Sequence, residues 1–339
     1  MKEPEKKADK ALLKVIFAEV IKGFTYAEIP QYGEVCIRHL TNLDSAGIDL
    51  IKKQYFERAE SKGLPTEKER LKDLNDLGQW TEEQDKYIQE QKKFLDNLYH
   101  TRSKLFLERD KADVNKKIRK TEKNLYESTI RKAELLGLTC ELYADKKVSE
   151  YYIAFSLRDK NGGFLLETKN GRVDLGDMET NEFETIKEIY ANKMSNFNSL
   201  NLKRISVSPF FLNFYSLCDK NPQIFYGKPI VELTFHQAEL ATYARSFMNL
   251  VENAKNQAPD YLFEDPDALL EYYEGQTSGE KMVESGEGKD GSTIVGATKQ
   301  ELEKVGVKKD ENSKDLAKEA AKKGGSLSMQ DLMKLHGLK

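Results

Sequence analysis

The feature that most constrains this fold is a long helical segment from Thr81 to about Leu136, which contains neither proline nor glycine. Its apolar residues recur in helical steps at Tyr87, Phe94, Leu98, Leu105, Ile118, Leu125, Ile130 and Leu136. A helix of that length cannot fold back within one globule. We therefore expect two antiparallel helices that break near residues 108–114, where Asp113 would cap the second helix. A single long helix is the alternative.

The remaining pattern predicts a mainly α fold with one small N-terminal β-hairpin. Residues 25–40 show strand alternation on either side of a turn at Pro30 to Gly33. Trp80 directly precedes a capping box formed by Thr81 and Gln84, so we expect it to be a structural pin rather than a ligand platform. Further helices are expected over 11–23, 42–61, 66–74, 140–157, 179–195, 200–206 and 265–273.

The most apolar part of the chain lies between Ser208 and Leu250. A helix is expected to begin at Pro209, because proline suits the first helical position, and to end at Asn221–Pro222. Residues 225–229 read as a turn, and Thr234 with Gln237 forms a capping box for a helix to about Asn253. This pair of helices must be buried, either in the core of the protein or in a partner.

Changes of composition divide the chain into six parts. These are a disordered tail at 1–8, a helix, β-hairpin and further helices at 9–80, a long helical hairpin at 81–137, an aromatic-rich helical core at 138–274, a disordered acidic and Gly/Ser linker at 275–325, and a short C-terminal helical motif at 326–339. Residues 264–290 carry nine acidic residues and two lysines, a charge of −7 that does not favour a packed core.

Charge argues against a general affinity for nucleic acid, because the whole chain has a net charge of −3. Residues 102–134 are locally basic, with eleven Lys or Arg and six Asp or Glu. Acidic residues alternate with the Lys and Arg residues, whereas aromatic residues do not. We therefore favour a solvated helical face over a phosphate-binding stripe. The stripe would use Arg102, Lys104, Lys116, Lys117, Arg119, Lys120 and Lys123.

No arrangement in the sequence points to catalysis, a metal or a cofactor. The four histidines lie far apart, and Cys36-x-x-His39 is half of a zinc pattern without a second half. The three cysteines are also widely spaced, which indicates a reducing cytoplasm rather than a disulfide framework. The charged N-terminus lacks the apolar core of a secretory signal. We expect a cytoplasmic protein that does not contact membranes, with no enzymatic role, although an enzyme of unfamiliar type stays open.

Two segments resemble proteins that assemble the tail and baseplate of tailed bacteriophages. Residues 208–247 are similar to tail assembly chaperones in their order of apolar helix, Pro/Gly turn and Leu233–Thr234 cap. Residues 35–44 are similar to the strand-then-helix opening of baseplate-hub assembly proteins. The resemblance covers less than a quarter of the chain. It implies an assembly chaperone in the host cytoplasm that binds the tape measure or another tail protein, or a structural component of the virion.

The residues expected to hold such a partner fall into two sets. The first lies in the aromatic-rich helices, where ordinary core packing is the alternative: Phe210, Phe211, Phe214, Tyr215, Phe225, Tyr226, Phe235 and Tyr243. The second lies in the C-terminal motif, whose short apolar helix on a flexible tether would dock in a groove: Met329, Leu332 and Met333. The alternative for that motif is a C-terminal turn without a binding role. The sequence leaves open whether the motif would dock onto the protein itself or onto a partner.

Overall fold

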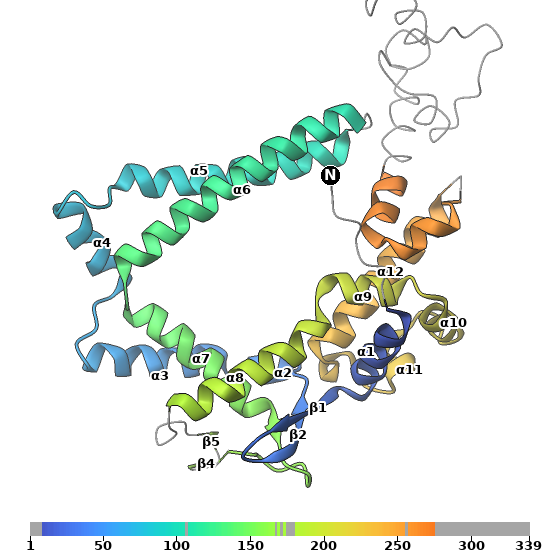
Figure 1. Ribbon diagram of the computed structural model, residues 1–339, viewed down its shortest axis with the longest axis horizontal. Coiled ribbons are helices and arrows are strands. Elements are labelled where there is room, and N and C mark those ends of the chain that lie inside the picture. The colour runs from blue at the N-terminus through green and yellow to red at the C-terminus, as the bar shows by residue number, and fades with distance from the viewer. Residues whose placement is uncertain are drawn as a thin grey trace, which may run out of the picture. The chain divides into compact units, whose positions relative to one another are not determined.

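The computed structural model describes residues 9–105, 108–166, 168–169, 172–173, 180–254 and 257–274 (Figure 1). This part of the chain is mainly helical with a small antiparallel sheet, so the predicted fold class is confirmed. Its contacts define two compact units, one from the described residues up to 93 and from 123 to 270, the other from those of 94–122 and 271–274. The predicted tail at 1–8, the linker at 275–325 and the motif at 326–339 lie outside the described residues.

The predicted N-terminal helix and β-hairpin are both present. Helix α1 spans Lys10–Lys22 and ends at Gly23, which adopts a left-handed φ of 80°. Strand β1 (Phe24–Ile29) pairs antiparallel with β2 (Gly33–Arg38). A third strand, β3 (Leu157–Arg158), joins β2. Sequence periodicity assigned Leu157 to a helix, because a two-residue strand is specified by its distant partner rather than by its own pattern.

The single helix predicted over 42–61 is wrong, since the structure divides it into α2 (Asn42–Ser45) and α3 (Ile48–Ser61). A complete capping box between Thr41 and Asp44 closes the first turn of α2. Ala46 and Gly47 separate the two helices, and Gly47 is the residue before the first turn of α3, without a side-chain cap. Helix α4 (Glu67–Asp76) begins at the predicted capping residue Thr66.

The long charged segment forms two antiparallel helices, α5 (Glu82–Lys104) and α6 (Glu108–Leu136), as predicted (Figure 1). The predicted cap at Asp113 is wrong, because α6 begins before it and Asp113 lies inside the helix. Trp80 is buried against Leu74 and Ile88, and its indole N–H donates to Asp85 Oδ1 at 3.0 Å. Its expected role as a structural pin at the base of the hairpin is therefore confirmed.

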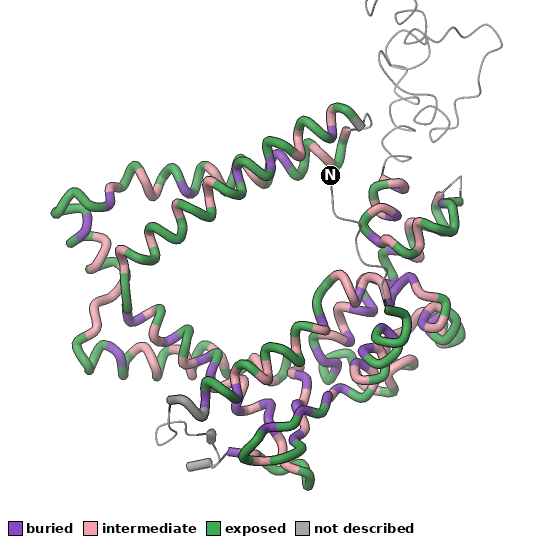
Figure 2. Tube along the Cα trace, in the orientation of Figure 1, coloured by how far each residue is buried: buried purple, intermediate pink, exposed green. Residues whose placement is uncertain are grey.

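Besides the cluster around Trp80, two larger hydrophobic cores lie in the described part of the first unit. One lies between the sheet, α7 (Cys140–Ser156) and α8 (Thr180–Met194), and contains Val35, Ile37, Leu157 and Ile186. The other joins α1, α9 (Ser199–Ser206) and α12 (Phe235–Asn253) through Ile16, Leu202 and Leu240. Buried residues are concentrated around these cores, whereas α5 and α6 are mostly exposed (Figure 2).

The remaining elements are short. They are β4 (Thr168–Lys169), β5 (Arg172–Val173), η1 (Ser195–Phe197), α10 (Pro209–Leu217), α11 (Pro222–Tyr226), η2 (Ile230–Glu232), η3 (Asp260–Glu264) and a helix over 266–274. In the second unit, Tyr99 O–H donates to Glu122 and Arg102 forms an ion pair with Glu271. None of the described helices combines the length and the apolar character needed to cross a membrane.

Candidate interaction surface

Helix α10 is apolar on two sides, and only one side is covered. Phe211 and Tyr215, one turn apart, are fully buried against α1 and α12. Phe214 and Leu217 lie on a different side of the same helix and are 60% and 81% exposed. When large apolar side chains are exposed together beside a packed core, they can mark a binding surface.

A tight connection fixes α11 immediately after α10. Asp219 and Lys220 both adopt left-handed backbone conformations, with φ of 51° and 56°. Such conformations cost non-glycine residues about 1 kcal/mol or more each. The structure holds them through the Lys220 N–H, which donates to the Tyr215 carbonyl at 3.1 Å, and through an ion pair between Lys220 and Glu252 of α12.

Helix α11 corrects one prediction and shortens another. Asn221 and Pro222 were expected to end a helix, but they begin α11 (Pro222–Tyr226). The turn expected over 225–229 is present but shorter, since Phe225 and Tyr226 belong to α11 and the chain turns at Gly227 and Lys228. The Asn221 side chain accepts the Gln223 N–H, and Pro222 occupies the first helical turn. Phe225 packs against Phe211 and Tyr215, with ring centroids 5.4 and 5.3 Å away. This anchor leaves Ile224 on the exposed side. We call Phe214, Leu217 and Ile224 the α10–α11 patch.

A second exposed apolar group surrounds the start of α12. Thr41 and Thr234 form an isolated antiparallel bridge, and the Phe235 N–H donates to the Leu40 carbonyl at 2.9 Å. The bridge brings α2 and η2 into contact. Four exposed apolar side chains lie on these elements, and we call them the bridge patch: Leu43, Ile230, Val231 and Phe235.

The structure separates the predicted partner-binding residues into three groups. Phe211 and Tyr215 are core residues, as the alternative interpretation had it, because they are fully buried and a partner cannot reach them. Phe214 and Phe235 are exposed. The others are partly buried: Phe210, Phe225, Tyr226 and Tyr243. Met329, Leu332 and Met333 lie outside the described residues.

Five residues of the two patches were not among the predicted partner-binding residues: Leu43, Leu217, Ile224, Ile230 and Val231. One signal for Leu217 was available. Phe211 and Tyr215 form one helical stripe, and Phe214 with Leu217 forms another three residues apart. A short helix that is apolar on two sides either lies in the middle of a core or presents one side to a partner. Ile230 and Val231 carry no such signal, because a short 3₁₀ turn has no long periodic pattern.

The predicted basic stripe is exposed, but its charges are interrupted. Lys116, Lys117, Arg119 and Lys120 all lie exposed on α6. Two members have carboxylate partners, since Arg102 pairs with Glu271 and Lys123 lies 3.8 Å from Glu127. The basic residues are therefore exposed, and carboxylates neutralise part of their positive charge.

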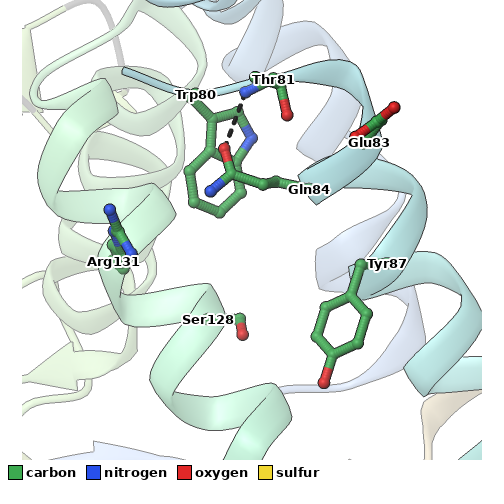
Figure 3. A pocket seen from close by; sticks show the side chains of 7 residues that line it. All are labelled: Trp80, Thr81, Glu83, Gln84, Tyr87, Ser128 and Arg131. Carbon is green, nitrogen blue, oxygen red and sulfur yellow. Dashed lines mark hydrogen bonds between the residues drawn. The ribbon is translucent and has the colours of Figure 1, made fainter. Parts of the chain in front are cut away.

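A small pocket of about 320 Å³ lies at the base of the hairpin (Figure 3). Trp80, Thr81, Gln84 and Tyr87 line it together with residues of α6. The Thr81 N–H donates to Gln84 Oε1 at 2.8 Å, so the polar groups at its upper end are engaged in starting α5. We interpret this hollow as a feature of the helix start and assign no chemistry to it.

Titratable side chains do not assemble into a metal site in the ranges that the structure describes. No group of three or more His, Cys, Asp or Glu residues there could hold a metal ion. Cys36, Cys140 and Cys218 are free thiols. His39 and His236 do meet, with ring centroids 5.1 Å apart, and both pack against Phe197. They form part of the core beside the bridge.

No family model, no curated protein and no solved structure matches this chain. Its function must therefore be argued from its own residues.

Proposed function

We propose that this chain is a non-enzymatic assembly factor that binds another protein through the α10–α11 patch. The observation that carries the proposal is the exposure of Phe214 and Leu217 directly beside the buried pair Phe211 and Tyr215. Burying an exposed leucine or phenylalanine in a partner stabilises a complex by about 1.5–3 kcal/mol per side chain. The patch therefore supports an apolar partner surface.

The rigid support of this patch favours binding of a partner without large rearrangement. Phe225 anchors α11 in the core, and the ion pair between Lys220 and Glu252 ties the connection to α12. A surface that is already ordered loses little conformational entropy when a partner binds. The bridge patch offers a second apolar area on the same compact unit.

The partner that the sequence resemblance suggests is an elongated protein of a phage tail, such as the tape measure. Such a protein has long apolar helical segments that would aggregate before assembly, and an apolar helix docks naturally on an exposed apolar patch. A virion structural component that uses the same patch within the finished particle is the closest alternative. Both forms share the docking surface and differ in whether the chain leaves the particle.

The experiment is co-expression with individual tail proteins, followed by affinity purification of this chain. The full chain is compared with a chain that ends at Glu274, which lacks the predicted C-terminal motif. Co-purification with both chains supports docking on the helical unit, and loss on truncation assigns recruitment to the C-terminal motif. Failure of every tail protein to co-purify with either chain would contradict the chaperone form of the proposal.

Nucleic-acid association through the basic stripe is the second candidate. Its support is the shared exposed surface of Lys116, Lys117, Arg119 and Lys120 on α6. Such binding weakens steeply with salt, because each neutralised phosphate releases counterions. The carboxylates that interleave with these bases make this candidate the weaker one.

A further inference from the structure

The exposed face of the three-stranded sheet carries a hollow that the α10–α11 patch does not use. Across the strands, Phe24 lies opposite Arg38, Tyr26 opposite Cys36, and Cys36 opposite Arg158. Directly paired residues share one face of a sheet. Two aromatic rings, a thiol and two guanidinium groups therefore lie on the same side, around a hollow of about 340 Å³. That volume is within the usual range of small-molecule sites.

Basic side chains outnumber acidic ones in the lining of this hollow. Arg38 Nη2 lies 2.9 Å from Asp44 Oδ1, but among the described residues no carboxylate forms an ion pair with Arg158. Both guanidinium groups lie over the Phe155 ring, at 5.2 and 5.1 Å from its centroid. Burial and the charge of Arg38 lower the pKa of Arg158. Arg158 Nη1 also donates to the carbonyl oxygens of Phe155 and Leu157. A bound anion would use the remaining N–H groups of the two guanidinium groups.

The two carboxylates at the rim do not fill that role. Asp159 Oδ1 accepts the backbone N–H groups of Asn161 and Gly163, each at 2.8 Å, and so holds the turn after β3. Glu34 lies opposite Glu28 at the other end of the sheet from the row that contains Arg38. Lys160, which is exposed on the turn, adds a third cation to the lining. The lining therefore holds three cations and two carboxylates, a net charge of +1, and Glu34 lies at the end away from Arg38.

The aromatic side of the hollow is open for stacking. Tyr26 is exposed, and its ring packs edge-on against Phe24 with centroids 5.3 Å apart. Exposed aromatic rings beside arginines accept planar ligands, because a flat ring can stack on either group. A ligand that fits both halves carries an anion at one end and a planar ring at the other.

We propose that this hollow binds a nucleotide, with the phosphate held by Arg38, Arg158 and Lys160 and the base stacked on Tyr26, with Phe24 at its edge. Guanidinium groups present several N–H donors in a fixed fork, which suits phosphate oxygens. The nucleotide can be free or part of a single strand of nucleic acid. The site is separate from the α10–α11 patch, so nucleotide binding can be tested independently of the proposed assembly function.

Binding is measured on the full chain at low salt by titration calorimetry with AMP, adenosine and inorganic phosphate, and by fluorescence anisotropy with a labelled ten-residue oligo-dT. We expect AMP or oligo-dT to bind, and adenosine to bind at least tenfold more weakly than AMP. Stacking accounts for a large share of such affinity, so Tyr26→Ser weakens binding about fivefold or more. Lys160→Gln also weakens binding, and Glu34→Gln strengthens it by removing a repulsive carboxylate.

Matched control variants lie on exposed positions elsewhere in the chain. Tyr126→Ser and Lys68→Gln alter the same residue types outside the hollow and leave binding unchanged. Tyr26 and Lys160 are both exposed, so their variants keep the fold, and circular dichroism verifies this. Binding by AMP alone identifies a free nucleotide as the ligand, and binding by oligo-dT alone identifies a single strand.

A second readout uses the thiol in the hollow. Cys36 lines it, whereas Cys218 lies outside it and is also partly exposed. A bound nucleotide slows maleimide modification of Cys36, measured by peptide mass spectrometry, and leaves Cys218 as the internal control. The proposal is overturned if neither AMP nor oligo-dT binds, if Tyr26→Ser and Lys160→Gln leave binding unchanged, or if inorganic phosphate binds as tightly as both AMP and oligo-dT.

Discussion

At the scale of single residues, the most unusual group is the imidazole of His39. It is 1% exposed, and neither ring nitrogen has a hydrogen-bond partner among the described residues. Its ring lies 4.6 Å from Phe197 and 5.1 Å from His236, centroid to centroid. Burial, and secondarily the neighbouring His236, lowers the pKa of His39 to about 3. Burial lowers the pKa of His236 as well.

This pair predicts a loss of stability in mild acid. Because the folded-state pKa of His39 lies below the unfolded value of about 6.5, the unfolded state binds the proton more tightly. The stability that the neutral His39 side chain contributes is fully present above the unfolded pKa, and it is lost as pH falls from about 6.5 towards 3. When the pH is lowered from 7 to 5, we expect the free energy of unfolding to fall by about 2 kcal/mol because of His39.

Urea unfolding of the full chain at pH 7 and pH 5 tests this expectation. His39→Leu removes the titrating group and should flatten the pH dependence. His100→Gln, at an exposed histidine of α5, should leave it unchanged. An equal loss of stability on acidification in the wild type and in His39→Leu would show that other groups are responsible.

Two tyrosine hydroxyls make a second contrast at this scale. The Tyr226 hydroxyl is buried with no hydrogen-bond partner among the described residues, and burial raises its pKa. The Tyr243 hydroxyl donates to Glu239 Oε1 at 2.8 Å and lies 2.6 Å from Ser199 Oγ. We expect Tyr226→Phe to be neutral or to stabilise the chain, and Tyr243→Phe to cost about 1 kcal/mol. Thermal unfolding of the two variants checks the difference, and a larger loss for Tyr226→Phe would contradict it.

At the scale of elements, helix starts decide much of the architecture, and α12 shows how. Gln237 is fully buried at the third position of this helix. Its Oε1 accepts the Thr234 N–H at 3.0 Å, and its Nε2 donates to the carbonyls of Val20 and Ile21 at 2.9 and 3.1 Å. One side chain therefore caps α12 and also binds the last turn of α1. The cap doubles as a contact between two elements that are distant in sequence.

Gln237→Leu should cost about 3 kcal/mol, because it removes the hydrogen-bond partner of the Thr234 N–H and of the Ile21 carbonyl, whereas the Val20 carbonyl keeps the Gly23 N–H. Gln84→Leu is the matched control, since Gln84 occupies the corresponding position of α5 but is only partly buried. We expect the control to cost less than about 1 kcal/mol. Chemical unfolding of both variants gives the comparison, and equal losses would mean that the contact with α1 contributes nothing.

The same elements show what the sequence could and could not predict. Helix starts at Thr66, Pro209 and Thr234 were predictable, because capping and first-turn preferences act within four residues. The break at Gly47 was missed, since one glycine is tolerated inside a helical pattern. Strand β3 was missed because its hydrogen bonds come from β2, more than a hundred residues earlier in the chain.

The candidate site was predicted only in part. Apolar density identified the region around α10, but it did not separate Phe211 and Tyr215, which are buried, from Phe214, which is exposed. That distinction depends on α1 and α12 covering one side of the helix, and this is a tertiary property. The hollow on the sheet was invisible to the sequence, because it requires Arg158 to lie beside Cys36.

At the scale of the whole molecule, net charge and its distribution bear on the class of partner. The chain carries −3 overall, and acidic residues interleave with the basic ones on α6. We expect no retardation of duplex DNA by the full chain at low salt, measured by gel shift. Retardation that is lost when Lys116, Lys117, Arg119 and Lys120 are all changed to Gln would instead favour the nucleic-acid candidate.

The central claim is that the α10–α11 patch binds a protein partner. The most direct measurement compares how much co-expressed tail protein is retained by Phe214→Ser/Leu217→Ser and by Leu77→Ser/Leu138→Ser, a control pair of exposed leucines elsewhere on the same unit. The account predicts at least a tenfold loss of retained protein for the first variant, and none for the control, because about 1.5–3 kcal/mol is lost per deleted side chain. Equal retention by both folded variants would contradict it.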